Sequence, residues 1–269
     1  MTLSFCSFSS GSSGNSYLIR SECTGILVDA GISGKKIIEG LSATQTPEEQ
    51  VKALLITHEH IDHVKSLKVI TKKLSGIKAY ANEKTWQAIE GKVNPLQQET
   101  FVTGEAFMIG DILVKPFPIS HDAAEPVGFS FFADEKQITV VTDTGYITEE
   151  IFQEMKTADI LALEANHDEN MLKMGRYPWS VKQRILGDKG HLSNTMAGKC
   201  ICKILDDCKQ AREKKQRRIL LAHLSRENNF PEMAFQTIKN VLEESEHYLG
   251  SNLQIHTIIK DEISLVYEV

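Results

Sequence analysis

A short segment that is dense in metal-binding side chains constrains this chain more than any other feature. It reads Thr-His-Glu-His-Ile-Asp-His, and its potential ligands are His58, His60, Asp62 and His63. An apolar run at 51–56, which predicts a buried strand, leads directly into it. Because His58 and His60 are two apart on an extended backbone, their side chains point the same way and can hold one ion. Asp62 and His63 follow where the chain must turn, so they can face a second ion. Imidazole and carboxylate groups suit borderline divalent metals, so the segment predicts a metal site at a strand end.

The pattern His-x-His-x-Asp-His after an apolar strand resembles the signature of the metallo-β-lactamase superfamily. Four further positions are similar to the remaining motifs of that family and occur in the expected order. They are Asp29 after a strand at 24–28, His121 after 117–120, Asp143 after a strand at 137–142 and His223 after a strand at 217–222. The resemblance therefore covers most of the chain.

The resemblance implies a centre with two divalent metal ions. In this arrangement His58, His60 and His121 bind the first ion. Asp62, His63 and His223 bind the second ion, and Asp143 bridges both. The donors are nitrogen and oxygen atoms without a thiolate, so zinc, manganese and iron are all suitable cofactors. Two ions about 3.5–4 Å apart lower the pKa of a shared water, which makes hydrolysis by a bridging hydroxide the expected chemistry.

Asp29 has two interpretations. It matches the first motif of the superfamily, which implies a catalytic role in supporting the metal ligands without binding an ion itself. It could instead cap a helix that begins near Gly34. Ser33 is better placed to cap that helix, so the supporting role is favoured.

His167 and His191 lie outside the implied ligand set. His167 follows the strand predicted at 159–163, and His191 precedes the helix predicted at 195–207. We expect one of them to contact the scissile phosphate or to protonate the leaving oxygen. The alternative for each is a hydrogen-bonded histidine in a loop. His247 and His256 are expected to be structural.

Small polar side chains near these motifs are candidates for substrate binding. The candidates are Ser13, Gly14, Asn15, Asn166, Ser193, Asn194 and Ser225. The Ser- and Gly-rich loop at 9–16 could bind an anion through its backbone N–H groups, or it could be a flexible turn. Basic residues could complete a path for phosphates. They are Lys182, Arg184, Lys189, Arg226 and the run 209–218, which could equally be a solvated surface.

The order of predicted elements indicates an α/β fold. Strands are expected near 2–8, 17–20, 24–28, 51–56, 78–80, 127–133, 137–142, 159–163 and 217–222, with a hairpin at 107–114 and a closing pair at 253–259 and 263–267. Helices are expected near 64–74, 83–89, 195–207 and 232–249. No repeat or linker divides the chain, so residues 1–269 are expected to form one domain. The resemblance implies a metallo-β-lactamase-like αββα sandwich, in which two mixed sheets lie face to face with helices on both outer faces.

Composition indicates the cellular compartment of the protein and the classes of partner that it lacks. The chain has 269 residues, a net charge of −6 and five cysteines without a Cys-x-x-Cys pair. It lacks the positive field of a non-specific nucleic-acid coat protein, and reduced thiols are expected. It shows no secretory signal and no apolar stretch that could cross a membrane, so we expect a cytoplasmic protein without a membrane partner. A secreted lactamase is thereby disfavoured.

The segments 165–168, 190–194 and 221–229 look like one branch of the superfamily, the YycJ/WalJ group. This resemblance implies a cytoplasmic 5′-to-3′ exonuclease of double-stranded DNA, with DNA as its partner. No protein partner is indicated.

Three other functions use the same motifs. A hydrolase of a small acyl or phosphate ester would use the same ions on another substrate, and a di-iron oxidoreductase would use the same ligands. A binding module without catalysis is disfavoured because the ligand set is complete.

Overall fold

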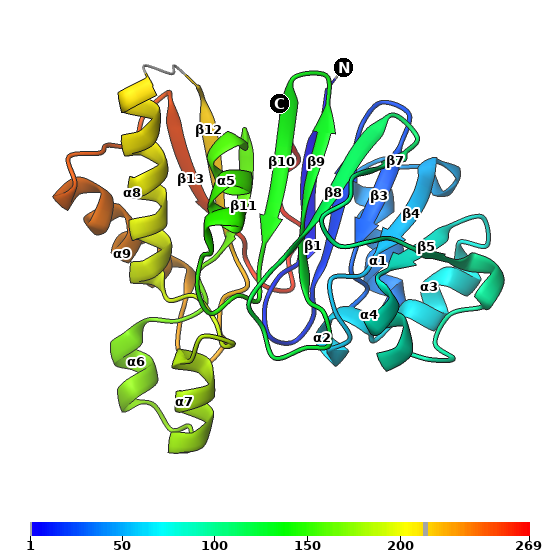
Figure 1. The fold of residues 1–269 in the computed structure, drawn as a ribbon, viewed down its shortest axis with the longest axis horizontal. Coiled ribbons are helices and arrows are strands. Elements are labelled where there is room, and N and C mark those ends of the chain that lie inside the picture. The colour runs from blue at the N-terminus through cyan, green and yellow to red at the C-terminus, as the bar shows by residue number, and fades with distance from the viewer. Residues whose placement is uncertain (1, 212–214) are drawn as a thin grey trace. The chain divides into compact units, whose positions relative to one another are not determined.

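A computed structural model describes residues 2–211 and 215–269. The chain divides into two compact units. Unit 1 comprises Met1–Pro118, Ala123–Ile138 and Ile259–Val269, and unit 2 comprises Ile119–Asp122 and Thr139–Ile258. The described strands form two mixed sheets of seven strands each (Figure 1). No helix in the described ranges has the length and apolar character needed to span a membrane.

The first sheet lies wholly within unit 1. Its strands, in spatial order, are β14 (Tyr267–Glu268), β1 (Ser4–Ser9), β2 (Ser16–Arg20), β3 (Gly25–Val28), β4 (Val51–Leu55), β5 (Lys78–Ala81) and β6 (Gln98–Thr100). Pairing is antiparallel from β14 to β3 and parallel from β3 to β6. All of β3 is buried, as is β4 apart from Lys52, which explains their nearly continuous apolar sequences. The carboxyl ends of these two strands carry Asp29 and the segment 57–63.

Helices cover the first sheet in unit 1. They are α1 (Gly34–Ala43), α2 (Ile61–Val64), α3 (Leu67–Lys73) and α4 (Glu83–Ala88), with short 3₁₀ turns at Glu48–Gln50 and Pro95–Gln97. Ile37 and Leu41 of α1 pack with Phe8 and Leu27 of the sheet in one buried core. Ser33 caps α1 by accepting a hydrogen bond from the Lys36 N–H, as predicted.

The helix predicted at 64–74 begins later than expected, because α2 ends at Val64 and the separate helix α3 spans Leu67–Lys73. Ser66 lies between them, and its N–H donates to the Ala30 carbonyl while its hydroxyl donates to the Ile32 carbonyl at 2.5 Å. These bonds to a distant part of the chain interrupt the helix, which sequence periodicity does not reveal.

The second sheet has the order β13-β12-β11-β10-β9-β8-β7. Its strands in unit 1 are β7 (Phe107–Ile109), β8 (Ile112–Pro118), β9 (Val127–Ala133) and the first half of β10 (Lys136–Val141). The predicted hairpin through Gly110-Asp111 is confirmed. Phe107 of β7 stacks on Tyr80 of β5 at 5.5 Å and on Phe101 at 5.7 Å between ring centroids. Within unit 1, therefore, strands of the two sheets pack through aromatic rings.

Unit 2 contains the remaining strands, β11 (Ile160–Glu164), β12 (Arg217–Ala222) and β13 (Leu253–Thr257), which pair in parallel. Its helices are α5 (Glu149–Thr157), α6 (Glu169–Met174), α7 (Trp179–Leu186), α8 (Asn194–Ala211) and α9 (Pro231–Glu244). Helix α8 packs against α9 and α5, and α9 packs against β13 (Figure 1).

Two predictions for the end of the chain are wrong. The helix expected to reach residue 249 ends at Glu244, where Ser245 and His247 donate their N–H groups to the Leu242 carbonyl. The expected pair of closing strands does not form. Instead β13 pairs with β12, and β14 pairs with β1 at the other end of the sequence.

Gly40 lets α1 approach the sheet closely, because a Cβ there would lie 2.5 Å from atoms of the buried Phe8 ring. We expect Gly40→Ala to lower the free energy of unfolding by about 1–3 kcal/mol through overpacking. This loss should exceed the gain in helix propensity of about 1 kcal/mol. The matched control is Ser42→Ala, an exposed position on the same helix. Urea denaturation of both variants measures the effect, and a Gly40→Ala protein as stable as the wild type would contradict it.

Candidate metal centre

Three of the predicted site residues end strands in an unusual backbone conformation. Asp29, Asp143 and His223 follow β3, β10 and β12, and their φ angles are 62°, 59° and 54°. This left-handed region is disfavoured for residues other than glycine, although Asp and His adopt it more readily than most. Such conformations cost on the order of 1–3 kcal/mol and persist where surrounding contacts enforce them. The three positions are therefore held in place by their surroundings.

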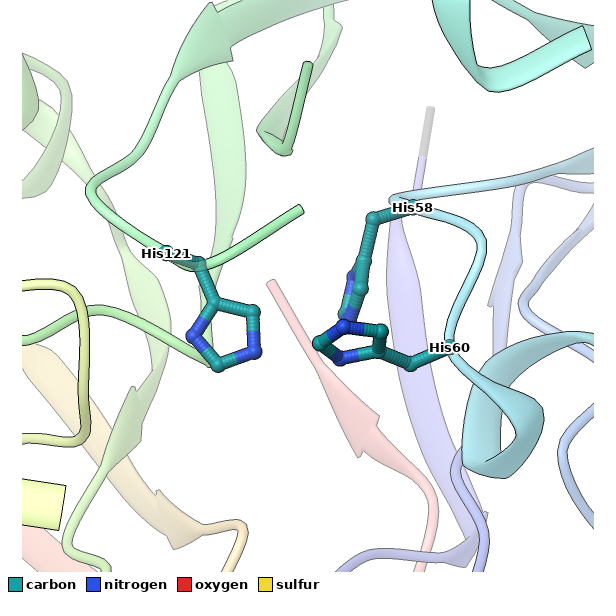
Figure 2. A group of neighbouring side chains, drawn as sticks. All are labelled: His58, His60 and His121. Atoms are coloured by element: carbon teal, nitrogen blue, oxygen red, sulfur yellow. The ribbon is translucent and has the colours of Figure 1, made fainter. Parts of the chain in front are cut away.

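In unit 1 the predicted ligands gather on the loop between β4 and α2 and on α2 itself. Figure 2 shows His58 and His60 on this loop. The centroid of the His58 ring lies 4.6 Å from that of His60 and 4.1 Å from that of His63. His63 Nε2 lies 3.6 Å from Asp62 Oδ2. The segment singled out in the sequence thus forms one compact group of donors.

Asp29 and Thr57 fix the orientation of two of these imidazoles. Asp29 Oδ2 lies 2.7 Å from His63 Nδ1, and Thr57 donates its N–H and hydroxyl to the Asp29 carboxylate. Since a carboxylate only accepts, His63 carries its proton on Nδ1. The Thr57 hydroxyl, already donating to Asp29, accepts from His58 Nδ1 at 3.0 Å. The lone pair of both rings is therefore on Nε2, and in His63 it faces the Asn15 side-chain amide at 3.1 Å. Asp29 does not cap α1.

In unit 2 a second group of donors forms around Asp143. Asp143, Glu164, His191 and His223 each offer an atom, and these atoms lie within 4.8 Å of one another. Asp143 Oδ1 lies 3.5 Å from His223 Nε2 and 3.8 Å from His121 Nε2. His121, also labelled in Figure 2, lies on the loop after β8, and its Nδ1 faces the Gly190 carbonyl at 3.3 Å. The predicted ligands of unit 2 thus belong to one cluster.

Glu164 is a member of this cluster to which the sequence analysis assigned no role. Its Oε1 lies 2.8 Å from Nδ1 of both His191 and His223, and its Oε2 accepts the N–H groups of Thr144 and Leu192. Burial opposes its charge, but the two imidazoles outweigh burial and hold the pKa of this carboxyl at about 2. The available signal was an acid at the end of an apolar strand, as at Asp29 and Asp143.

His167 is buried beside this cluster, and neither of its ring nitrogens has a hydrogen-bond partner among the described residues. Burial lowers its pKa to about 4, against the opposing effect of Glu164. A neutral imidazole of such low pKa is a poor proton donor at neutral pH. The low pKa therefore argues against His167 as the group that protonates a leaving oxygen.

Four of the expected substrate-binding residues are buried in unit 2, namely Asn166, Ser193, Asn194 and Ser225. The Asn166 amide donates to the His223 carbonyl at 2.9 Å, and the Ser225 N–H donates to the Asn166 carbonyl. The Ser193 hydroxyl caps α8 by accepting a hydrogen bond from the Met196 N–H. These contacts connect the loops after β11 and β12 with the start of α8, so they position His223 and its neighbours.

The loop at 9–16 in unit 1 is tied to the ligand segment. The Asn15 N–H donates to the Asp62 carbonyl, and its side-chain amide lies 3.1 Å from His63 Nε2. The Gly14 N–H donates to the Gly11 carbonyl, so the N–H groups of Gly14 and Asn15 are both engaged within the chain. Ser13 is exposed. The loop is thus fastened at Asp62 and is not a free turn.

The basic residues have different surroundings. Lys182 is buried, and its ammonium donates to the carbonyls of Lys173 and Gly175, so the prediction that it meets phosphates is wrong. Arg184 pairs with Asp122, while Lys189 and Arg226 are exposed. The basic run 209–218 includes residues 212–214, which lie outside the described ranges.

The donor sets fit divalent metal ions of borderline character. In His58, His63, His121, His191 and His223, Nδ1 faces an acceptor. This arrangement, in which the second ring nitrogen is held by a carboxylate, hydroxyl or carbonyl, is typical of metal-binding histidines. Neutral imidazoles and ionised carboxylates are the forms that bind zinc, manganese or iron.

A family model described as the β-lactamase superfamily domain matches residues 24–224. Exodeoxyribonuclease WalJ of Streptococcus pneumoniae is 39% identical over 265 residues, which cover 97% of this chain and 96% of that protein. Exodeoxyribonuclease YycJ of Bacillus anthracis is 39% identical over 259 residues, or 95% of each chain. The chain belongs to the YycJ/WalJ group of the metallo-β-lactamase superfamily.

The superfamily assignment agrees with the fold. The crystal structure of the metallo-β-lactamase fold protein YhfI of Bacillus subtilis has a TM-score of 0.72 and 14% identity, with 100% of this chain and 99% of that chain covered. The predicted family and fold class, and the expectation of a hydrolase of this superfamily, are therefore confirmed.

The variant Glu164→Gln tests the role of the carboxylate that accepts hydrogen bonds from His191 and His223. Its amide would have to face either the Nδ1–H groups or the backbone N–H groups of Thr144 and Leu192, which are all donors. We expect a loss of about 1–3 kcal/mol in the free energy of unfolding of metal-free protein. Metal affinity should fall about 10- to 100-fold. Denaturation and metal titration measure both, with Glu150→Gln on the exposed face of α5 as the control. Wild-type values for Glu164→Gln would contradict this role.

The low pKa of His167 predicts the pH at which this imidazole takes up a proton in metal-free protein. Its NMR signals should shift near pH 4 and stay constant between pH 5.5 and 8, since the imidazole is neutral in the fold. The unfolded chain takes up this proton near pH 6.5, so the stability due to His167 is complete above that pH and is lost as the pH falls towards 4. Comparison with His167→Gln assigns the signal, and titration near pH 6.5 would contradict the expectation.

Proposed function

We propose that this protein is a metal-dependent exonuclease that hydrolyses phosphodiester bonds of double-stranded DNA in the 5′-to-3′ direction. The main support is the 39% identity, over nearly the whole chain, to two proteins named exodeoxyribonucleases. The two donor groups are consistent with a metal-dependent hydrolase. A DNA substrate also fits the cytoplasmic location expected from the sequence.

We propose that two divalent ions are held by the seven ligands expected from the sequence. Four belong to unit 1 and three to unit 2, namely His58, His60, Asp62 and His63, and His121, Asp143 and His223. Since neither unit carries the whole set, we propose that residues 1–269 work as a single domain. When bound, the ions supply an activated water and stabilise the attacking and leaving oxygens of a displacement.

The residues around the ligands have separate proposed roles. Asp29 and Glu164 hold the Nδ1 protons of His63, His191 and His223, which keeps the Nε2 atoms ready for the metal or substrate. His191 would give a proton from Nε2 to the leaving oxygen while its Nδ1–H group stays bonded to Glu164.

Buried His167 would contact the substrate as a neutral hydrogen-bonding group. Ser13 is exposed and could contact a phosphate directly. The other proposed substrate-binding residues, Gly14, Asn15, Asn166, Ser193, Asn194 and Ser225, would act mainly by fixing the loops that carry the donors.

The test is purification with zinc, manganese or iron, followed by digestion of 5′- and 3′-end-labelled single- and double-stranded DNA. We expect early release of the 5′ label from duplex DNA and complete loss of activity with a chelator. Asp143→Asn should lower kcat/KM at least about 100-fold, because metal ions contribute several kcal/mol to transition-state stabilisation. The matched imidazole control is His247→Gln, which lies outside both donor groups and pairs with Asp206.

Degradation of DNA by protein from which a chelator has removed the metal ions would contradict the proposal. Hydrolysis of small phosphate or acyl esters without attack on DNA would favour the alternative of a small-ester hydrolase. Metal-dependent uptake of oxygen would instead favour the di-iron oxidoreductase.

A further inference from the structure

The segment 168–190 leaves the donor cluster of unit 2 and returns to it, and we name it the helical excursion. It begins directly after His167, contains α6 and α7, and ends directly before His191. Its base is closed, because His167 and Ser193 form a β-bridge and the Asn194 N–H donates to the His167 carbonyl. Figure 1 shows α6 and α7 as two short helices apart from α8 and α9.

The helical excursion is internally fixed. Lys182 of α7 is buried and binds the carbonyls of Lys173 and Gly175 at the end of α6. The turn at 187–190 that leads back to the cluster is also held, since the Ser120 hydroxyl donates to the Asp188 carbonyl and the His191 N–H donates to the Ile185 carbonyl. Groups on its surface therefore keep a defined position relative to His167 and His191.

The surface of the helical excursion combines exposed apolar groups with positive charge. Met174 is 88% exposed and Trp179 is 63% exposed, although Trp is usually well buried. The helical excursion contains five basic side chains and three acids, in a chain whose net charge is −6. Arg176 and Lys189 are exposed and form no hydrogen bond or ion pair with the described part of the chain.

We propose that the helical excursion is a DNA-contacting element, in which Trp179 stacks on a base at the strand end and Arg176 and Lys189 contact phosphates. This inference rests on the proposed nuclease function. It adds residues that bind the DNA substrate next to the donor cluster. A polyanion complements a local positive charge in an otherwise acidic protein. An exposed indole offers a stacking surface that accepts any base, as an enzyme that removes successive nucleotides requires.

The decisive variant is Trp179→Ala, compared with Trp179→Phe and Tyr248→Ala. Tyr248 is an equally exposed aromatic residue, but it lies next to Glu243, Glu244 and Glu246. Binding is measured by fluorescence anisotropy on the metal-loaded protein, with duplex DNA whose ends carry phosphorothioate linkages. We expect Trp179→Ala to weaken binding about 5- to 100-fold, as loss of one base–aromatic stack does. Trp179→Phe should largely restore it, and Tyr248→Ala should bind like the wild type.

A second measurement separates DNA contact from chemistry and folding. Hydrolysis of bis(p-nitrophenyl) phosphate, a diester without bases or a polynucleotide backbone, should be unchanged in Trp179→Ala. Arg176→Gln should lower the slope of log affinity against log salt by about 1, as expected for one lost phosphate contact.

The outcomes are distinguishable. Wild-type DNA affinity in Trp179→Ala, with DNA degradation intact, would overturn this inference alone and would leave another macromolecule as the occupant of this surface. If the wild-type protein hydrolyses the small diester but neither binds nor degrades DNA, the proposed function itself fails. If Trp179→Ala also loses the small-diester activity, the Arg176→Gln salt slope decides the question, and an unchanged slope would overturn the inference.

Discussion

The donor groups depend on hydrogen bonds between imidazole Nδ1–H groups and buried acceptors. Asp29 serves His63 in unit 1, and Glu164 serves both His191 and His223 in unit 2. Each bond fixes a ring's orientation and tautomer, and so determines which nitrogen keeps a lone pair. A buried carboxylate is costly unless it is fully bonded, and Glu164 meets this condition with four N–H donors. The sheets and loops around it are arranged to supply those donors.

Much of this arrangement could be predicted because it is local. The spacing of His58, His60, Asp62 and His63 is a property of a strand end and a turn, and both formed as expected. Asp29, Asp143 and His223 each follow an apolar strand, and a polar residue at such a strand end is a feature that the sequence itself displays. The alternation of strands and helices likewise predicted the fold class, and the family comparison confirmed it.

The rest depends on contacts between residues far apart in sequence. Thr57 and Glu164 acquire their roles only when Asp29 or His223 is brought to them. Glu164 at least ends an apolar strand, whereas Thr57 shows no recognisable pattern. Ser66 breaks a helix because its partners lie at Ala30 and Ile32. Lys182 looks like a surface charge until carbonyls of another helix surround it. Periodicity and composition contain no information about such pairs.

Within unit 2, the closed base of the helical excursion separates the positioning of the donor residues from the shape of the surface beside them. Because His167 and the start of α8 are bridged directly, the length and surface of the intervening helices can change while the bridged residues stay where they are. The bridged residues thus form a fixed base, and the helices between them can vary. Proteins with the same reactive centre could thus acquire preferences for substrates of different size by altering one insertion.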